Sequence, residues 1–447
     1  MKQISIVIML TCFSLGISQD IPNSFSLQEA IDFALENNRI AKNAARDIEA
    51  AEKQKWETTA TGLPQLDANI SYQNNLKQQI SLVPAEFFGG QPGEFVEVIF
   101  GVQHNVNATA TLNQLIFDGS YLVGLQSAKV FLEISENAKI KTDLEVRKNV
   151  INAYGNVLLS EETVTILEND IQVLQETLDE TTKIYENGLE ELESVEQLQI
   201  TLSNLQSSFN NAKRLKIIAY QILNIAMGIE YSASITLTDQ LEDLALKNIS
   251  LETLDQEEDV TTTIDYLIAE NDRKSKELLL KLEKSKALPR LSAFLNGGYL
   301  GFSDEFTFLN RDQDWAGFST LGFNLDIPIF SSAGRSAATQ RAKINLEKSK
   351  DELIETEQRL SLEIETAKSN YRFSTEDYYN KKQNLDLAQR IEKKNQTKFF
   401  EGIGSSFDLR QAQTQLYTAQ RELLQAMLDV INTKAELETI TNRISEN

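Results

Sequence analysis

The stretch "KFFEGIGSSFDLRQAQTQL" (residues 398–416) interrupts a long run of helix-forming residues with two glycines and two serines. A second stretch, "KIYENGLEELESVEQLQITL" (183–202), does the same, and its Gly188 precedes Gly402 by 214 residues. After each glycine, apolar residues recur at alternating steps of three and four, the pattern of a left-handed coiled coil. The two series are Val195, Leu198, Leu202, Leu205, Phe209 and Ala212, and Leu409, Ala412, Leu416, Ala419, Leu423 and Ala426.

Each stretch therefore predicts the tip of an antiparallel helical hairpin, where glycine supplies the left-handed residue that ends the first helix. The alternative is a kink within one continuous helix, but the duplicated series favours two hairpins. Proline-free segments lead to the tips from Tyr121 to Asn187 and from Arg335 to Glu401. Each predicts roughly 100 Å of helix. Return helices are expected at 189–228 and 404–444, and opening helices at 26–60 and 252–287. Helices of this length are expected to lack a compact core and to bury their apolar stripes in an oligomer.

Between the opening and the long helix of each half, the sequence predicts two strands, at 65–82 and 96–116 and at 289–303 and 315–330. The proline- and glycine-rich segment 84–95 predicts a turn or loop. In the last strand, Leu321, Phe323, Leu325, Ile327 and Ile329 share one face. In the first half, apolar residues alternate with polar ones that include Asp67, Asn69, Gln103, Asn105 and Asn107.

The residues on these two faces indicate whether the strands lie in water or in a membrane. A soluble β-sandwich that caps the helices would be expected to carry many charges on its polar face. A polar face with almost no charge instead suits a water-filled lumen, and an apolar face suits lipid. The roughly four strands of one chain cannot close a barrel, whereas three chains would supply about twelve.

The order of these elements predicts a mainly α fold with a small β part and an internal duplication. "GLPQLDA" (62–68) recurs as "ALPRLSA" (287–293), which supports two structural repeats at 19–228 and 252–447 with a linker at 229–251. Residues 1–18 have the pattern of a signal peptide, with Lys2, an apolar run and small residues before the expected cleavage site. Cys12, the only cysteine, lies in this segment, so the mature chain is expected to have no disulfide.

The composition argues against nucleic-acid binding and against catalysis. The chain has 66 acidic and 43 basic residues, and its net charge of −23 would repel nucleic acid. One histidine and no mature cysteine leave no His/Cys metal cluster and no Ser-His-Asp triad. His104 is expected near a membrane interface, and the many glutamates alternate with lysines on solvated helix faces. No enzyme activity, metal or cofactor is therefore expected.

Several segments, taken in order, resemble the TolC-like outer-membrane channels of Gram-negative export machines. They are "SLQEAIDFALENN" (26–38), "GLPQLDA", "AYGNVLLSEETV" (153–164), "YENGL" (185–189), "LNIAMGI" (223–229) and "GIGSSFDLRQAQTQLYTAQREL" (402–423). The resemblance implies a homotrimer with a 12-stranded transmembrane β-barrel in the outer membrane and an α-helical tunnel in the periplasm. It implies a passive exit channel for tripartite efflux or type I secretion, with a periplasmic adaptor, an inner-membrane pump and outer-membrane lipid as partners.

The resemblance also implies functional positions at the tips. The adaptor would dock around Tyr185, Gly188 and Leu189, and around Phe400, Gly402 and Gly404. The best-studied member of this family closes its periplasmic end with rings of acidic residues, and the matching positions are Asp408 and Gln411, of which Gln411 departs from the pattern. Asp408 alternatively caps the helix that follows Ser405 and Ser406, and the two roles are compatible. The alternative function is an exported periplasmic coiled-coil scaffold or an adhesin-like stalk.

Overall fold

The computed structural model describes residues 23–250 and 258–443, so the predicted signal peptide (1–18) lies outside the described residues. The chain forms two compact units, each built from separate segments. Unit 1 contains residues up to Lys42, Thr142–Glu258 and the residues from Glu363 onward. Unit 2 contains Asn43–Lys141 and Asp259–Leu362. None of the helices in these described ranges is long and apolar enough to cross a membrane.

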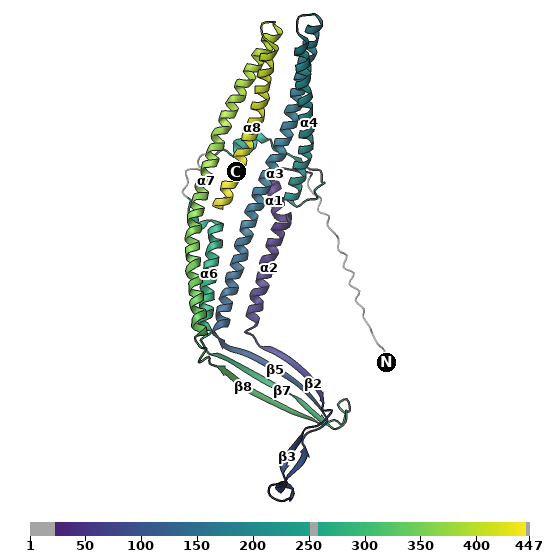
Figure 1. The fold of residues 1–447 in the computed structure, drawn as a ribbon, viewed down its shortest axis with the longest axis vertical. Helices are drawn as coiled ribbons and strands as arrows, with labels where there is room; N and C mark the ends of the chain where they lie inside the picture. Colours follow the sequence, from purple (N-terminus) through teal and green to yellow (C-terminus); the bar gives the residue numbers. More distant parts are fainter. Residues whose placement is uncertain (1–22, 251–257, 444–447) are drawn as a thin grey trace, which may run out of the picture. The chain divides into compact units, whose positions relative to one another are not determined.

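Two helical hairpins contain most of the helix (Figure 1). In the first, α3 (Gly119–Glu186, 68 residues) is followed by α4 (Leu192–Met227). In the second, α7 (Gly334–Phe400, 67 residues) is followed by α8 (Ser406–Thr441). The predicted three-four seam of the first hairpin is buried near its tip, where Leu174 and Leu178 of α3 pack with Val195 and Leu198 of α4.

The opening helices differ from the expected ones. The single helix expected at 26–60 is two helices, α1 (Leu27–Asn37) and α2 (Arg39–Ala60). Asn38 breaks them with an extended backbone (ψ 135°), and its side-chain oxygen accepts a hydrogen bond from the Ile40 N–H at 2.7 Å. The helix expected from 252 begins later, because α6 spans Ile264–Ser285 and the Thr263 side chain caps its N-terminus.

The four long strands form one antiparallel sheet in unit 2, in the order β2-β5-β7-β8. Their bounds are Gln65–Asn74, His104–Asp118, Arg290–Ser303 and Trp315–Asp326. The helices α2, α3, α6 and α7 all connect to the same end of this sheet, because α2 and α6 precede β2 and β7 whereas α3 and α7 follow β5 and β8. β2 and β8 are its outer strands, and neither has a second strand partner among the described residues.

Three of the predicted strand bounds were wrong. The strands expected at 65–82 and 96–116 are each interrupted, because β3 (Ile80–Pro84) and β4 (Phe95–Ile99) pair only with each other. A polar run without alternation, "NNLKQQ" (74–79), separates β3 from β2, and Gly101 with φ +110° separates β4 from β5. The strand expected at 315–330 ends at Asp326, because Pro328 has no N–H to donate. Ile327 and Ile329 therefore lie beyond β8.

Unit 1 has a compact apolar core, which the helix lengths did not predict. In it, α1, α3, α4 and α8 pack with α5 (Leu241–Lys247). β1 (Ser24–Phe25) pairs in parallel with β6 (Thr236–Leu237), and the buried Tyr154 hydroxyl of α3 donates to the Phe25 carbonyl at 2.9 Å. The segment expected to be a linker (229–251) thus covers the apolar stripes of the helices. This cover is the physical reason why a core forms within one chain.

Candidate functional site

The two hairpin tips in unit 1 have the same backbone geometry. Gly188 has φ +76° and Gly402 has φ +74°, values that glycine adopts without steric cost. At the first tip, the Gly188 and Leu189 N–H groups donate to the carbonyls of Tyr185 and Ile184. At the second tip, the Gly402 and Ile403 N–H groups donate to the carbonyls of Phe399 and Lys398. Each glycine therefore ends a long helix and reverses the chain direction.

The predicted docking residues all lie at these tips. Tyr185 is in the last turn of α3, Phe400 ends α7, and both are partly exposed, whereas Leu189 is almost fully exposed. Gly404 lies close to α7, since a Cβ on it would be 2.9 Å from Lys398 Cβ. Sequence analysis missed three further exposed apolar residues at the tips, Leu192, Ile403 and Phe407. They follow Gly188 or Gly402 within a few residues and do not belong to the three-four series of apolar residues. An apolar residue near a tip glycine and outside this series is the sequence signal that could have identified them.

The two tips lie side by side in unit 1 (Figure 1). The Ser194 hydroxyl of α4 donates to the Ser406 hydroxyl of α8 at 2.8 Å and lies 2.6 Å from Glu190 Oε1. The first turns of the two return helices are therefore in direct contact. Together with the exposed apolar residues of both tips, they form one surface, which we call the tip surface: Leu189, Leu192, Ile403 and Phe407.

Asp408 lies one turn beyond the second tip and forms two hydrogen bonds with the Ser405 hydroxyl. The N-cap of α8 is Ser405, and its hydroxyl accepts a hydrogen bond from the Asp408 N–H at 3.1 Å and donates to Asp408 Oδ2 at 2.8 Å. The expectation that Asp408 itself is the N-cap was therefore wrong, because Ser405 has the extended backbone that this position requires. Asp408 and Gln411 are both exposed, and their spacing of three places them on the same face of α8.

A buried acidic group lies between the two hairpins, further from the tips, and sequence analysis did not predict it. Asp170 of α3 is 8% exposed and lies 3.5 Å from the Gln420 amide of α8. Burial raises the pKa of Asp170 to about 6, and Glu392 of α7 adds to the effect. Burial also raises the pKa of Glu392 and that of the Tyr417 hydroxyl. We call these residues the acidic layer: Asp170, Glu392, Tyr417 and Gln420.

The contact between the hairpins is polar at this level. Gln420 Oε1, on the amide beside Asp170, has no hydrogen-bond partner among the described residues, and neither amide atom of the buried Gln413 of α8 has one. Unpaired buried groups cost free energy, whereas the seam within the first hairpin consists of leucine and valine. The two hairpins are therefore held together less strongly here than the two helices within a hairpin.

The sheet of unit 2 has the predicted polar face in its first half. Asp67 pairs with Thr111, Asn69 with Thr109 and Asn107 with Ser71, and Asn105 pairs with Gln73. Gln103 departs from the expectation, since it precedes β5, and its N–H donates to Asp304 Oδ1. In the second half, the same face carries Asn296 and Thr320 but also large apolar residues: Phe294, Leu300, Phe302 and Phe318. Phe294 lies over Gly322, where a Cβ would be 2.4 Å from its ring.

The opposite face of the sheet is apolar and exposed. Its exposed members come from three strands: Leu66, Ile70, Tyr72, Leu295, Tyr299, Trp315, Leu321, Phe323 and Leu325. At the end far from the helices, Tyr72 stacks on His104 and donates to or accepts from its Nδ1 at 2.8 Å. Phe306 and Phe308 pack edge-on against Tyr72, so His104 belongs to an aromatic cluster.

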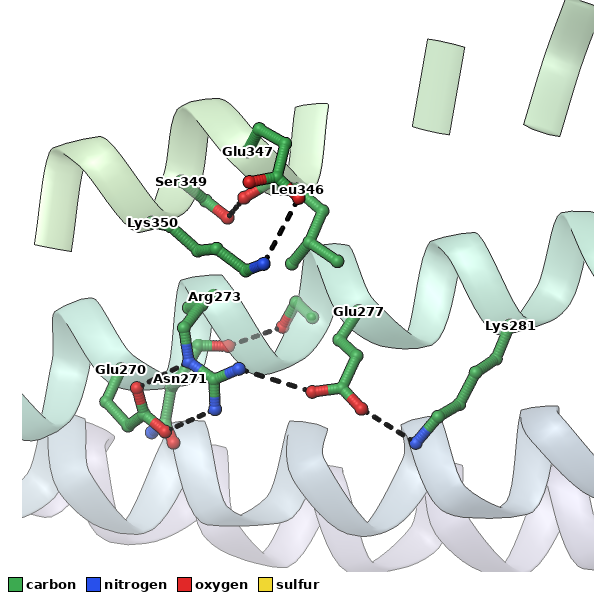
Figure 2. Close-up of polar contacts among 10 residues, drawn as sticks. Glu270, Asn271, Arg273, Glu277, Lys281, Leu346, Glu347, Ser349 and Lys350 are labelled. Atoms are coloured by element: carbon green, nitrogen blue, oxygen red, sulfur yellow. Dashed lines mark hydrogen bonds and ion pairs between the residues drawn. The ribbon is translucent and has the colours of Figure 1, made fainter. Parts of the chain in front are cut away.

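The helices of unit 2 carry a ladder of ion pairs (Figure 2). On α6, Arg273 binds Glu270 at 2.6 Å and Glu277 at 3.2 Å, and Glu277 binds Lys281 at 2.9 Å. A further pair joins α6 to α3, with Lys274 at 2.6 Å from Glu133. These pairs balance charge along the helix surface. Within the described ranges, no group of three or more His, Cys, Asp or Glu side chains is placed to hold a metal ion.

The sequence profile of the outer membrane efflux protein family matches residues 30–228 and 269–443. This match covers most of the chain and both of its hairpins. The chain belongs to the outer membrane efflux protein family. This efflux protein is therefore an outer-membrane channel protein, and it is not an enzyme.

Solved structures share the fold of this efflux protein. The outer membrane protein VceC of Vibrio cholerae superimposes with a TM-score of 0.70 at 16% identity, over 93% of this chain and 96% of VceC. The channel protein CusC gives a TM-score of 0.75 at 17% identity, over 93% and 92% of the two chains. The Campylobacter jejuni outer membrane channel CmeC gives 0.70 at 18% identity, over 93% and 85%. No curated protein sequence matches the chain significantly.

Proposed function

We propose that three copies of this chain form a passive exit channel for a tripartite efflux or type I secretion system. The observation that carries the proposal is the four-stranded sheet, whose outer strands β2 and β8 have no strand partner among the described residues. Unpaired sheet edges are sites of strand addition. Since β2 and β8 run in opposite directions, the β2 edge of one copy can pair with the β8 edge of the next in antiparallel fashion. Three copies then close a barrel of twelve strands.

The faces of the sheet support this barrel. The exposed apolar face would contact the lipid of the outer membrane, with the aromatic cluster around Tyr72 at its far boundary. The lumen would be lined by Asp67, Asn69, Asn105 and Asn107, together with the aromatic residues of β7 and β8. Gln103 would lie at the outer mouth, since it precedes β5 at the end far from the helices.

An apolar stripe on α4 supports contact between copies in unit 1. Leu215, Ile218, Ile222 and Ile225 are all about half exposed or more, and they recur at steps of three, four and three. A helix does not normally present such a series to water, and it fits the seam of a coiled coil with a second chain. We assign a neighbouring copy to this stripe, because a closed ring gives every copy two neighbours.

The tip surface is the proposed docking site for a periplasmic adaptor, which would connect the channel to an inner-membrane pump. Its exposed apolar residues and the exposed Tyr185 and Phe400 offer contacts for the apolar face of a helical partner. Asp408 and Gln411 would line the periplasmic end. Three Asp408 carboxylates near one axis would favour cations there, with an effect that salt screens.

The same order of elements occurs twice and supports two repeats, one through the α3–α4 hairpin and one through the α7–α8 hairpin. In each, a helical segment is followed by two sheet strands and then by a long hairpin. The two halves thus contribute two strands and two long helices each to the proposed channel wall.

The deciding experiment is the native mass of the protein after outer-membrane fractionation and extraction in mild detergent. We expect a detergent-dependent particle of three chains that conducts ions when it is reconstituted in a planar bilayer. A monomer or dimer in the soluble periplasmic fraction would contradict the channel and would favour a coiled-coil scaffold.

A further inference from the structure

The connection between β2 and β5 contains a small β-hairpin that stands apart from the main sheet (Figure 1). β3 and β4 pair over five residues each, from Ile80 with Ile99 to Pro84 with Phe95. The Ala85 N–H donates to the Glu94 carbonyl at 2.8 Å and closes the turn around a short 3-10 helix (Ala85–Phe88). A two-stranded hairpin of this size is marginally stable alone in water. It therefore requires a partner surface.

Both faces of this β-hairpin are apolar. The pairing places one set of side chains on the first face, which we call face A and whose only charged member is Glu97: Ile80, Leu82, Pro84, Phe95, Glu97 and Ile99. The other set forms face B: Val83, Val96 and Val98, with Ser81. On face A, Leu82 is 65% exposed and Phe95 is 63% exposed, whereas on face B Val96 is exposed and Val83 and Val98 are half-buried. A membrane surface or a single partner protein would cover one face, whereas this β-hairpin has two faces to cover.

The position of the β-hairpin indicates what covers both. It follows β2 directly, and β2 is the edge strand that pairs with a neighbouring copy in the proposed trimer. Each β-hairpin therefore begins beside the boundary between two copies. In a closed ring of three, every copy has one neighbour on each side, so one neighbouring copy is available to each face of the β-hairpin.

We propose that the three β-hairpins pack into a ring at the outer mouth of the channel, with face A of one copy against face B of the next. This inference rests on the proposed trimer. Glu97 is the only charged residue in β3 and β4, and it lies on face A opposite Leu82. Since the ring places each Glu97 carboxylate against the apolar face B of a neighbouring copy, burial of this charge costs free energy, and the variant Glu97→Gln is expected to stabilise the ring.

Disulfide formation between copies tests the ring. The only cysteine of the chain is Cys12, within the predicted signal peptide, so the mature protein offers a background without thiols. The variant Leu82→Cys/Val96→Cys places one thiol on each face, and opposite faces of the β-hairpin keep these two thiols apart within one chain. We expect an oxidant to produce covalent trimers of the full-length protein in outer membranes, and a reductant to abolish them.

Two further variants ensure that the test does not depend on the orientation of a single pair of thiols. Phe95→Cys/Val83→Cys again joins face A to face B and is expected to give covalent trimers. Ile80→Cys/Leu82→Cys places both thiols on face A, so it is expected to give none. Covalent dimers from this control would show that face A meets face A, which overturns the ring.

The native mass in mild detergent separates the possible failures. If particles of three chains form but neither cross-face pair gives covalent trimers, the ring is wrong and the proposed channel stands. If no particle of three chains forms, the proposed function fails and the ring fails with it. If the thiol of Leu82→Cys resists a water-soluble maleimide in membranes but reacts in detergent, lipid covers face A, and this outcome also overturns the ring.

Discussion

At the scale of single residues, Asp170 shows how burial creates a group that responds to pH. Its carboxylate lies between two helical hairpins with the Gln420 amide as a neighbour and no basic residue among the groups that shift its pKa. Because its pKa in the folded protein is about 6 and the ordinary value is 3.8, the folded state binds the proton more tightly. Ionisation therefore destabilises the fold as the pH rises from about 4 to 6, and the full cost remains above that range.

The variant Asp170→Asn should remove this cost. We expect it to be more stable than the natural protein at pH 7.5, by at most about 3 kcal/mol, since one pKa unit corresponds to about 1.4 kcal/mol. Near pH 4 the two proteins should have the same stability. Thermal unfolding in detergent across this pH range measures the difference. The exposed Glu168→Gln on the same helix is the control, and an Asp170→Asn protein with an unchanged pH profile would contradict the assignment.

Sequence reasoning at this scale worked where the pattern was local. The period of two placed Asp67, Asn69, Asn105 and Asn107 on one face of the sheet, because strand geometry depends only on neighbouring residues. Asp170 could not be found in this way. Its burial depends on α8, about 250 residues further along the chain, and nothing around Asp170 in the sequence indicates that contact.

At the scale of elements, the glycine tips decide where each hairpin turns. No atom lies within 4 Å of a Cβ placed on Gly188 or Gly402, so only the positive φ opposes a side chain there. A left-handed conformation costs a residue with a side chain about 1–2 kcal/mol. Gly188→Val and Gly402→Val should therefore distort the tip surface without disturbing the sheet.

We expect these two variants to reach the outer membrane in normal amounts and to lose most export activity. Quantification of the outer-membrane fraction and an export assay in the same cells give the two readouts. Gly334→Val serves as the control, because Gly334 also has open space around it but an ordinary φ. An equal loss of membrane insertion and of export would count against a docking role for the tips.

The contact between the tips offers a second test at this scale. The Ser194 and Ser406 oxygens are 2.8 Å apart, so the variant Ser194→Cys/Ser406→Cys should form a disulfide. Since the contact between the hairpins is polar near the acidic layer, we expect the hairpins to part during transport. Oxidation should then lower the conductance of the reconstituted channel, and a reductant should restore it.

Ser406→Cys alone is the control for this pair. An oxidised double variant with full conductance would show that the tips stay together while the channel conducts. The hairpins themselves were predictable, because their three-four series and glycines are adjacent in sequence. The break at Asn38 was not, since it depends on the Asn38 side chain, which donates to the distant Ala226 carbonyl.

At the scale of the whole molecule, unpaired surfaces argue for an assembly of several copies. Ile222 on the α4 stripe is 54% exposed, so a glutamate there costs little in a single chain but would be buried in a trimer. We expect Ile222→Glu to fold normally by circular dichroism and to lose the particle of three chains in mild detergent. Gln206→Glu introduces the same charge on α4 away from the stripe and should leave the trimer intact. A stable Ile222→Glu trimer would exclude this stripe from the interface.

Composition and repetition predicted an exported, duplicated, mainly helical chain, because these properties are sums over many residues. They did not predict the core of unit 1 or the separate β3–β4 hairpin. Both come from connecting segments, 229–251 and 75–103, in which the contacts of a few apolar residues matter more than any repeating pattern. In these connecting segments, the two halves of the chain differ from each other.

The nearly equal lengths of α3 and α7, 68 and 67 residues, constrain how such a protein changes during evolution. Deletion of one heptad from α3 and its return helix would draw the first tip back by about 10 Å. The contact of Ser194 with Ser406 would then be lost unless the second hairpin lost the same heptad. An insertion or deletion in one of the four hairpin helices, α3, α4, α7 and α8, should therefore be inherited together with matching changes in the other three. Relatives with longer or shorter hairpins should then differ by whole heptads in both halves.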